Sequence, residues 1–461
     1  MKKGYYILIL CVLSVVCVFA QNTQTADSAY SRPLIDVLRD IENRFDIEVK
    51  YDARLIDGKI LKYADWRIKP WSAEESLIAV LAPFDYKFVM DNGKYKIKEF
   101  EYARATEEEG KKFLDYLETL YSDKESWEKR KAELKACLPE ALRVSPMPAK
   151  PESKIILTPK RKYDGYTVEN FAIETLPGIY VCGSIYKPAK IKGKCPVILN
   201  PNGHFGNGRY REDQQMRCAT QARMGAISVS WDLFAWGESL LQFDGTLHRL
   251  SAANTIQTLN AIGILDYLLS LKEADATKVG ITGGSGGGSM TMMMSAIDDR
   301  ITVSIPVVML SSHFVGGCPC ESGMPAHLCG GRTNNAEIAA MFAPKPQLAL
   351  TDGKDWSSSV PGLELPYLKK VYGFYGAEDN IENMHFPTEG HDYGPSKRMA
   401  MYSFITKYLG LNHDMVDESK VTIEKELQMR TFGENGEKLP ANAIKGKEAL
   451  LEVLKNVGII D

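Results

Sequence analysis

Apolar positions between residues 32 and 100 follow a helical spacing first and a strand spacing later. Apolar residues at every third or fourth position of 34–45 predict an amphipathic helix, and the capping box Ser72-Ala-Glu-Glu75 predicts the start of a second one. Apolar and polar residues then alternate through 86–97, on both sides of Asn92-Gly93, a pair favoured in tight hairpin turns. This block is therefore predicted to be a small α+β domain, at 32–100.

From about residue 160 the pattern changes to short apolar strands that alternate with helices. Seven segments have the composition of strands: 166–175, 178–188, 195–201, 226–232, 278–282, 300–308 and 345–353. Helical segments lie between several of them, and 256–271 carries its apolar residues on one face. Alternating strands and helices predict the α/β class, with a mainly parallel sheet flanked by helices. In such sheets, sites form at the carboxyl ends of the strands.

The remaining segments connect or extend these two blocks. Residues 101–150 are rich in Glu, Lys, Leu and Ala, and we interpret them as a helical linker with a solvated, charged face. Prolines at 146, 148 and 151 indicate the boundary that follows it. We therefore expect a catalytic domain at 151–415 and a C-terminal extension at 416–461.

The first 20 residues have the features of a secretory signal. Lys2 and Lys3 precede an apolar run from Tyr5 to Phe19, and Ala20 ends a small-residue cleavage site. The run is too short to cross a membrane comfortably, and no later stretch reaches the ~20 apolar residues that a span needs. We expect a cleaved signal at 1–20, a periplasmic or secreted protein and no membrane span. The alternatives are a retained anchor and a lipid anchor at Cys17.

Composition and charge exclude several classes of protein. Of the 461 residues, 44% are hydrophobic and 25% are charged, which is typical of a globular chain rather than a disordered, collagen-like or coiled-coil one. Lys and Arg number 56 against 59 Asp and Glu, giving a net charge of −3. Such a chain has no basic field to hold a phosphate backbone, so no nucleic-acid partner is expected.

The cysteines leave a choice between a disulfide and a metal. An odd number of them remains after the predicted signal, so at least one thiol is unpaired in a compartment where disulfides form. Cys318-Pro-Cys320, with His327 and Cys329 nearby, suggests a zinc ligand set, but its single-residue spacer is shorter than that of most zinc sites. We favour a disulfide within this loop, or plain packing, and expect neither metal nor cofactor.

The segment Gly283-Gly-Ser-Gly-Gly287 matches the pattern G-x-S-x-G. It directly follows the predicted strand 278–282 and precedes a helical segment, which is the context that a nucleophilic serine on a sharp turn requires. No Lys follows, which argues against a phosphate-binding loop; a flexible Gly/Ser loop is the other alternative. Ser285 is therefore the candidate nucleophile.

A serine hydroxyl requires a base and an acid to orient that base. His391 lies on a late loop rich in Gly and Pro, ahead of a helix predicted at 396–408, and His385 is its nearest competitor. The acid is expected after the strand that ends near Thr351. We prefer Asp355, because Asp352 can satisfy the turn itself, and place Asp379 third.

Two backbone amides are expected to stabilise an oxyanion. Gly286 begins a helix directly after the nucleophile, so its amide is available to a developing negative charge. The second donor is expected at His204 or Phe205, in the glycine-rich turn after strand 195–201, although that turn can also be an ordinary one. Trp356, His313 and the loop from Cys318 to Cys329 are further candidates for lining a substrate pocket; packing around the site is the alternative.

The order of elements at 32–100 resembles the secretin and TonB short N-terminal (STN) domain. The segments "PLIDVLRDIENRFDIEVKYD", "SAEESLIAVL" and "YKFVMDNGKYKIK" carry this resemblance over about 70 residues. It implies an envelope interaction module with an envelope protein as its partner; an accessory fold that packs on its neighbour is the alternative.

Residues from about 125 to 412 resemble the α/β-hydrolase superfamily, and within it the acetylxylan-esterase-like and prolyl-oligopeptidase-like secreted hydrolases. The segments "NGHFG", "DLFAWGES", "GGSGG", "FAPKPQLALTDGKDW" and "EGHDYGPSKR" carry it. The resemblance implies Ser285 as nucleophile, Asp355 as acid and His391 as base. The chain departs from the family's His-Gly-x-Gly-Gly at Asn202 and Phe205, and has Gly286 where glucuronoyl esterases have Arg.

These observations predict a secreted serine ester hydrolase. Its expected substrate is an esterified glycan, from which it removes acetyl or methyl groups of plant-type polysaccharides by a Ser-His-Asp mechanism. A peptidase of the prolyl-oligopeptidase type and a non-catalytic envelope module on a hydrolase scaffold are the alternatives.

Overall fold

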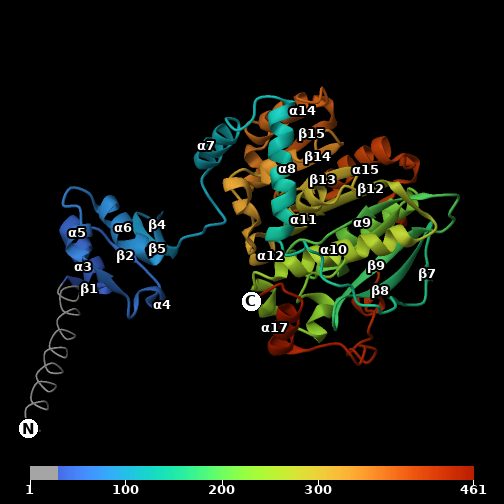
Figure 1. Cartoon of the computed structure of the whole chain (residues 1–461), viewed down its shortest axis with the longest axis horizontal. Coiled ribbons are helices and arrows are strands. Elements are labelled where there is room, and N and C mark those ends of the chain that lie inside the picture. The colour runs from blue at the N-terminus through green and yellow to red at the C-terminus, as the bar shows by residue number, and fades with distance from the viewer. Residues whose placement is uncertain (1–29) are drawn as a thin grey trace, which may run out of the picture. The chain divides into compact units, whose positions relative to one another are not determined.

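The computed structural model of the chain describes residues 30–461, which form two compact units (Figure 1). The first ends at Tyr102 and the second runs from Ala103 to Asp461. The predicted signal at 1–20 lies outside the described residues. Within the described part of the chain, no helix is long and apolar enough to cross a membrane.

The first unit consists of short helices, a three-stranded sheet and a two-stranded one. Its elements are β1 (Ser31–Pro33), α3 (Leu34–Phe45), β2 (Val49–Lys50), α4 (Ala53–Ile56), β3 (Ile60–Lys62), α5 (Ala64–Arg67), α6 (Ala73–Leu81), η1 (Ala82–Phe84), β4 (Tyr86–Asp91) and β5 (Lys94–Glu99). The predicted cap is confirmed, since the Ser72 side chain accepts from the Glu75 amide. The predicted hairpin is also confirmed, because β4 and β5 pair antiparallel around Asn92 and Gly93, both with positive φ.

The second unit is built on a ten-stranded sheet in the order β15-β14-β13-β12-β10-β11-β9-β8-β6, with β7 also paired to β8. Its strands are β6 (Ile156–Leu157), β7 (Arg161–Lys162), β8 (Tyr166–Leu176), β9 (Ile179–Pro188), β10 (Cys195–Leu199), β11 (Ile227–Trp231), β12 (Ala274–Gly284), β13 (Val303–Val307), β14 (Gln347–Asp352) and β15 (Ile381–Phe386). Strands β10 to β15 pair parallel, and β9 and β8 add an antiparallel side. The seven predicted strands and the mainly parallel sheet are confirmed; β6, β7 and β15 were not predicted.

Helices surround this sheet. They are α7 (Glu107–Leu117), α8 (Lys124–Ala141), α9 (Glu212–Arg223), α10 (Ala253–Ser270), α11 (Gly286–Ile297), α12 (Pro319–Ser322), α13 (Asn335–Ala340), α14 (Glu364–Gly373), α15 (Pro395–Leu409), α16 (Glu426–Met429) and α17 (Gly446–Asn456). Short segments of 3-10 helix lie at η2 (Gly208–Tyr210), η3 (Gly237–Leu241), η4 (Gly245–Arg249), η5 (Pro325–Gly331), η6 (Trp356–Ser359), η7 (Glu378–Asn380), η8 (His413–Met415) and η9 (Glu418–Lys420).

Both faces of the sheet are covered by helices. Side chains along a strand point alternately to the two faces, so neighbouring residues of one strand belong to different cores. On β10, Val197 and Leu199 belong to a core that includes residues of α10 and α11. Ile198, between them, belongs to a second core with residues of α15. The central strands are mostly apolar because helices cover both faces. Polar side chains are therefore carried by the loops that follow the strands.

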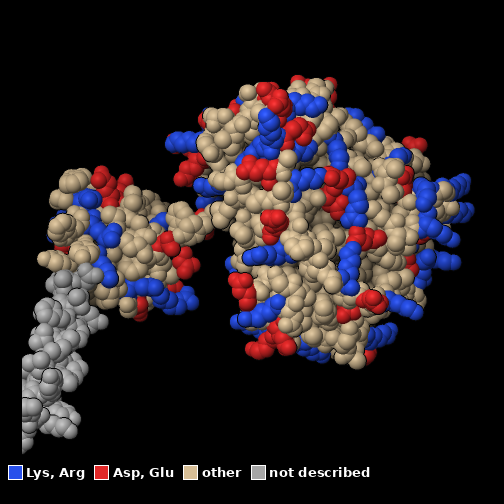
Figure 2. Space-filling model, in the orientation of Figure 1, with Lys and Arg blue, Asp and Glu red and all other residues tan. Residues whose placement is uncertain are grey.

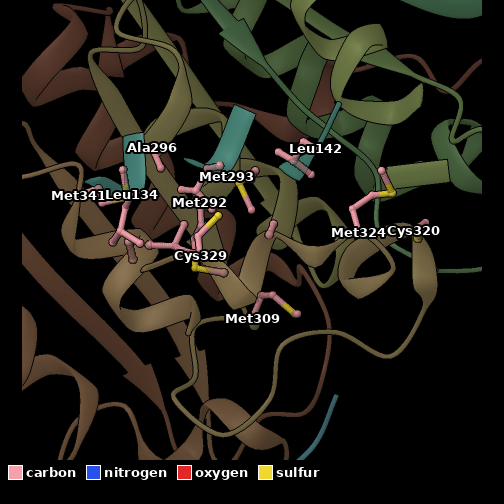
Figure 3. Packing of buried hydrophobic residues seen from close by; sticks show 14 of the residues in the cluster. Leu134, Leu142, Met292, Met293, Ala296, Met309, Cys320, Met324, Cys329 and Met341 are labelled. Atoms are coloured by element: carbon pink, nitrogen blue, oxygen red, sulfur yellow. The ribbon is translucent and has the colours of Figure 1, made fainter. Parts of the chain in front are cut away.

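Helix α8 belongs to the core of the second unit, which corrects its interpretation as part of a helical linker with a solvated face. Trp127, Leu134 and Leu138 are fully buried in the largest apolar cluster. Figure 3 shows part of this cluster, where Leu134 lies with Met292 of α11 and Met341. The charged residues of α8 occupy its other faces. Because they are numerous, the sequence suggested a solvated helix although one face carries a buried apolar stripe.

Cys137 of α8 forms a disulfide with Cys329, across 192 residues of sequence. The prediction of a disulfide within the 318–329 loop is therefore wrong, and Cys318 and Cys320 are free and buried. His327, also in that loop, contacts Asn335. The disulfide fixes the loop to α8.

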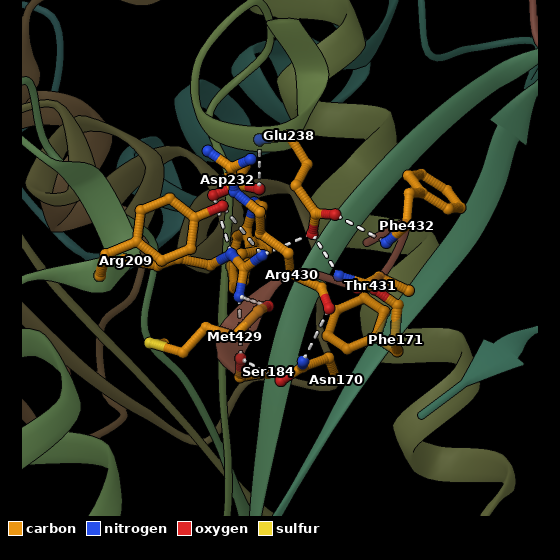
Figure 4. Close-up of polar contacts among 12 residues, drawn as sticks. Asn170, Phe171, Ser184, Arg209, Asp232, Glu238, Met429, Arg430, Thr431 and Phe432 are labelled. Carbon is orange, nitrogen blue, oxygen red and sulfur yellow. Dashed lines mark hydrogen bonds and ion pairs between the residues drawn. The ribbon is translucent and has the colours of Figure 1, made fainter. Parts of the chain in front are cut away.

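A buried ionic network joins the loop after β10 to the C-terminal extension (Figure 4). Arg209 contacts Asp232 and Glu238, each at 2.8 Å, and donates to the carbonyl of Met429. Glu238 accepts the amide of Thr431 at 2.8 Å. Because every partner is held by a charge-assisted hydrogen bond, the end of the 200–211 loop is fixed.

Charged side chains of both signs are interspersed over the face shown in Figure 2. The basic side chains on this face have acidic neighbours over much of it, in keeping with the nearly balanced composition.

Candidate active site

Ser285 lies on a sharp turn between β12 and α11. Its backbone has φ 56° and ψ −125°, in a region that a residue with a side chain rarely adopts. The amide of Ser285 donates to Val307 on the adjacent strand β13, at 3.0 Å, which holds the turn at the carboxyl end of the sheet. This is the strand–turn–helix geometry that exposes a nucleophilic hydroxyl.

Close backbone contacts explain the glycines around this turn. A Cβ at Gly287 would lie 2.4 Å from the carbonyl oxygen of Pro201, a distance at which the chain must shift. A Cβ at Gly203 would lie 2.3 Å from the Gly284 oxygen and 3.0 Å from the Ser285 Cβ. The loop after β10 therefore packs directly against the serine turn.

His391 and Asp355 are brought together by two different loops. Nδ1 of His391 lies 2.6 Å from Oδ2 of Asp355, whose side chain is 4% exposed. The other carboxylate oxygen, Oδ1, accepts from the amide and hydroxyl of Ser357, both at 2.6 Å. Asp355 is thus oriented by Ser357 and in turn fixes the ring of His391 with Nε2 directed away from the acid.

The competing acid and base have other partners. Oδ1 of Asp352 accepts the amide of Lys354 at 3.0 Å and so closes its own turn, as the sequence predicted. Burial raises the pKa of this carboxyl, and Lys397 lies 3.7 Å from its other oxygen. His385 contacts Thr351 on the neighbouring strand at 2.9 Å, and Asp379 lies in η7.

Phe205 packs beside both the serine turn and the histidine. Its ring lies 5.5 Å from the ring of His391, and one of its carbons lies 3.3 Å from the position of a Cβ at Gly284. Among residues 30–461, no hydrogen bond joins Ser285 Oγ to His391. Contacts of this kind are commonly long without substrate and tighten when it binds.

The two predicted oxyanion residues lie next to each other. Gly286 is the first residue of α11, so its amide has no acceptor within the helix. The ring of His204 approaches it, since a Cβ at Gly286 would lie 3.0 Å from Cε1 and Nδ1 of that ring. The loop that carries the His204 amide therefore borders the turn that carries the Gly286 amide.

Ser285 opens onto a pocket with a volume of about 480 Å³. Trp356 lines it, as expected, and its ring lies 4.7 Å from that of His391. His313 is not among the lining residues; it contacts Ser311, and burial lowers its pKa.

Sequence reasoning missed several residues that line this pocket. They are Trp236, His248, Arg249 and Phe314, whereas Cys318 and Glu321, which also line it, belong to the 318–329 loop named as a candidate. Trp236 lies in the segment "DLFAWGES", but His248, Arg249 and Phe314 belong to no motif, and the packing of separate loops brings them to one place. Arg249 supplies a positive charge to a pocket whose other lining residues include aromatic side chains and the carboxyl of Glu321.

A cluster of potential metal ligands borders the same pocket. One nitrogen each from His204 and His248 and the sulfurs of Cys318 and Cys320 all lie within 4.8 Å of one another. The contact with the Cys320 thiol lowers the pKa of Cys318 below that of an ordinary thiol, and the two imidazoles lower it further. Burial opposes this shift of the pKa. The four side chains come from three separate segments; the sequence suggested the two cysteines as metal ligands and His204 only as an oxyanion residue.

The sheet order and the serine turn define an α/β hydrolase. No protein-family model matches the chain. The solved structure "Methylesterase BT1017" is 54% identical, with a TM-score of 0.85, over 95% of this chain and 99% of that one. The chain therefore belongs to the family of that methylesterase, and it is a carboxylic ester hydrolase.

Two curated proteins show weaker similarity over shorter regions. The protein YtaP of Bacillus subtilis (strain 168) is 24% identical over 48% of this chain and 82% of its own length. Acetyl esterase Axe7A of Xylanibacter ruminicola is 25% identical over 40% of this chain. The matched region spans 44% of Axe7A, less than half of that protein.

Proposed function

We propose that the protein is a secreted serine esterase that removes methyl or acetyl groups from plant-type polysaccharides, with methyl esters of uronic acids in pectin as the preferred substrates. The observation that carries the proposal is the 2.6 Å contact between His391 and Asp355 beside the strained turn of Ser285. The family relationship to a methylesterase supports the choice of ester.

In this mechanism, Ser285 attacks the ester carbonyl while His391 takes its proton. Asp355 keeps the proton of His391 on Nδ1, so that Nε2 is the base, and stabilises the imidazolium that forms. The imidazolium then protonates the departing alcohol. For a methyl ester the alcohol is methanol, and the uronic acid stays bound to the serine as an acyl group. Water, activated by His391, releases it.

Negative charge develops on the carbonyl oxygen in each tetrahedral intermediate. The amide of Gly286 at the start of α11 is the first donor to it, and the helix dipole favours the same charge. The amide of His204, or that of Phe205, is the second. The close packing of Gly203 on the serine turn supports a donor from this loop.

The pocket favours a bulky acyl group over an acetyl group. Its volume of about 480 Å³ accommodates a sugar residue. Trp356 and Trp236 provide flat apolar surfaces of the kind that pack on sugar rings. Arg249 provides a charge for the carboxylates of a partly esterified uronic acid chain. In a methylesterase the sugar is the acyl group and must bind in this pocket throughout the reaction.

Product analysis tests the proposal. Purified protein is incubated with methylated pectin, acetylated xylan and a feruloylated oligosaccharide, and methanol, acetate and ferulate are measured. The proposal predicts turnover of pectin with release of methanol at a higher kcat/KM than the release of acetate. Turnover of the feruloylated substrate alone, or of none of them, would contradict it.

Export and the role of the first unit are further proposals. We propose that the mature chain begins at Gln21, after a cleaved signal, and that residues 32–100 form an STN-like domain that contacts an envelope protein. Exposed Trp66 and Trp71 support a binding role for this unit. Sequencing the N-terminus of protein recovered from the periplasm tests export, and an N-terminus at Met1 would contradict it.

A further inference from the structure

We propose that His204, His248, Cys318 and Cys320 bind a zinc ion beside the active-site pocket. The residues belong to three separate segments: the loop after β10, η4, and the turn at the start of α12. Their ligating atoms nevertheless all lie within 4.8 Å of one another. Two nitrogen and two sulfur ligands in a tetrahedral arrangement are the donor set that favours zinc over magnesium or calcium.

The distances in the cluster are close to those of a tetrahedral site. With Zn–N near 2.0 Å and Zn–S near 2.3 Å, two nitrogens are separated by about 3.3 Å and a nitrogen and a sulfur by about 3.6 Å. Here Nε2 of His204 lies 2.8 Å from Nε2 of His248 and 3.1 Å from Sγ of Cys320. For these two pairs, an ion at the centre requires the ligands to move apart by a few tenths of an ångström; the other pairs lie within 4.8 Å, and those beyond about 3.8 Å would have to move together.

Each histidine has an oxygen atom near the ring nitrogen that faces away from the cluster. Nδ1 of His248 lies 2.6 Å from the carbonyl oxygen of Phe234, which can only accept, so the proton is on Nδ1 and Nε2 has a free lone pair. Nδ1 of His204 lies 4.0 Å from Oε2 of the buried Glu321. His248 is therefore oriented as metal-binding histidines are, by a carbonyl behind the ring, whereas the Glu321 carboxylate is near His204 but beyond hydrogen-bond distance.

A disulfide between Cys318 and Cys320 is the competing explanation of the sequence pattern. It would account for the two sulfurs but not for the two imidazoles that point at them. Both cysteines are free thiols in the structure. A metal explains all four side chains at once, because two thiolates balance the charge of the ion and two neutral imidazoles complete the tetrahedron.

The proposed zinc is structural. Four protein ligands fill a tetrahedral site and leave no position for water or substrate. The ion would fix the loop carrying the His204 amide to η4 and to the Cys318–Cys320 turn. The ring of His204 already lies against Gly286, so the metal would hold one proposed oxyanion donor beside the other. His204 would act on the reaction as a positioning residue through its side chain.

The metal content of the protein tests this inference. The chain is produced without an affinity metal column or chelator, and zinc and copper are measured by mass spectrometry. We expect about one zinc per chain in the wild type and less than about a tenth of this in Cys318→Ser and Cys320→Ser. The matched control is Cys218→Ser, which removes another buried free thiol, in α9, and is expected to retain the zinc.

Cobalt provides a second measurement that does not depend on a correctly folded variant. The zinc of the wild type is exchanged for Co²⁺, and absorption by cobalt–thiolate bonds is expected in the wild type itself. A wild type that contains no more zinc than Cys318→Ser, copper in place of zinc, or a Cys318–Cys320 disulfide in peptides from the native protein would overturn the inference. Metal content is measured without an ester substrate, so its failure is distinguishable from failure of the proposed function.

Discussion

Arg130 of α8 is paired with Glu337 of α13 through two nitrogen–oxygen contacts of 2.9 Å, and the two side chains are 5% and 0% exposed. Arg130 also donates to the carbonyls of Gly330 and Arg332, next to the disulfide-bonded Cys329. This ion pair joins helix α8 to α13, and together with the buried apolar side chains of α8 it makes the helix part of the second unit.

Removing one member of this buried pair is expected to destabilise the second unit strongly. Arg130→Met leaves the Glu337 carboxylate buried without its partner, and a loss of about 3–5 kcal/mol in the free energy of unfolding follows. Urea unfolding measures it. The matched control on the same helix is Lys129→Met, which breaks an exposed pair with Glu125 and is expected to change stability by less than about 0.5 kcal/mol. Equal effects of the two substitutions would contradict the structure.

The disulfide between Cys137 and Cys329 is expected to make stability sensitive to reductants. Because it closes a loop of 192 residues, its loss is predicted to reduce stability by about 2–5 kcal/mol. The midpoint of thermal unfolding should therefore fall when dithiothreitol is added to the wild type. The double variant Cys137→Ala/Cys329→Ala should already have the lower midpoint and should not respond. A wild type with the same midpoint in both conditions contradicts this pairing.

Substitution of two neighbouring carboxylates, Asp355 and Asp352, distinguishes the proposed catalytic acid from a carboxyl with a structural role. Asp355→Asn removes the group that holds the proton of His391 on Nδ1, so kcat is expected to fall by about 10³–10⁴-fold. Asp352→Asn changes a carboxyl that closes a turn, and it is expected to keep kcat within about tenfold. Steady-state rates on one methyl ester, with matched circular dichroism, compare the two. The opposite order of effects would exchange the roles of Asp352 and Asp355.

Much of the catalytic unit is predictable because its signals are local. The motif around Ser285 is a short strand–turn–helix pattern, so the glycines reveal it, although the contacts that require some of them come from the loop after β10. The choice of Asp355 over Asp352 follows from turn chemistry that is also local. The central strands are recognisable because burial on both faces makes them almost continuously apolar.

The parts that escaped prediction depend on contacts distant in sequence. Strand β15 lies at the sheet edge and has mostly half-buried residues, so its pattern is weak. The charged residues of α8 suggested a solvated helix, although the spacing of Trp127, Leu134 and Leu138 by seven and four residues marks a buried stripe. Neither the partner of Cys137 nor the approach of His204 to His248 has a local signal.

Arg249 is expected to bind the charged part of the substrate rather than take part in the reaction. Arg249→Gln should raise KM for partly methylated pectin by about tenfold, the equivalent of one charge-assisted hydrogen bond, with a smaller effect on kcat. A small uncharged methyl ester, which lacks neighbouring carboxylates, serves as the control and should be little affected. The effect should also diminish at high salt, because ions screen exposed charges. Equal losses on both substrates would show that Arg249 does not recognise charge.

The hydroxyl of Ser285 is the centre of the account, and Ser285→Ala tests it most directly. Methanol release from methylated pectin is measured for the variant and the wild type, with circular dichroism and urea unfolding to show that both are folded. We predict a loss of at least about 10⁴-fold in kcat at unchanged stability, because no other side chain at the turn can form the acyl-enzyme. Undiminished release of methanol by the folded variant would contradict the assignment.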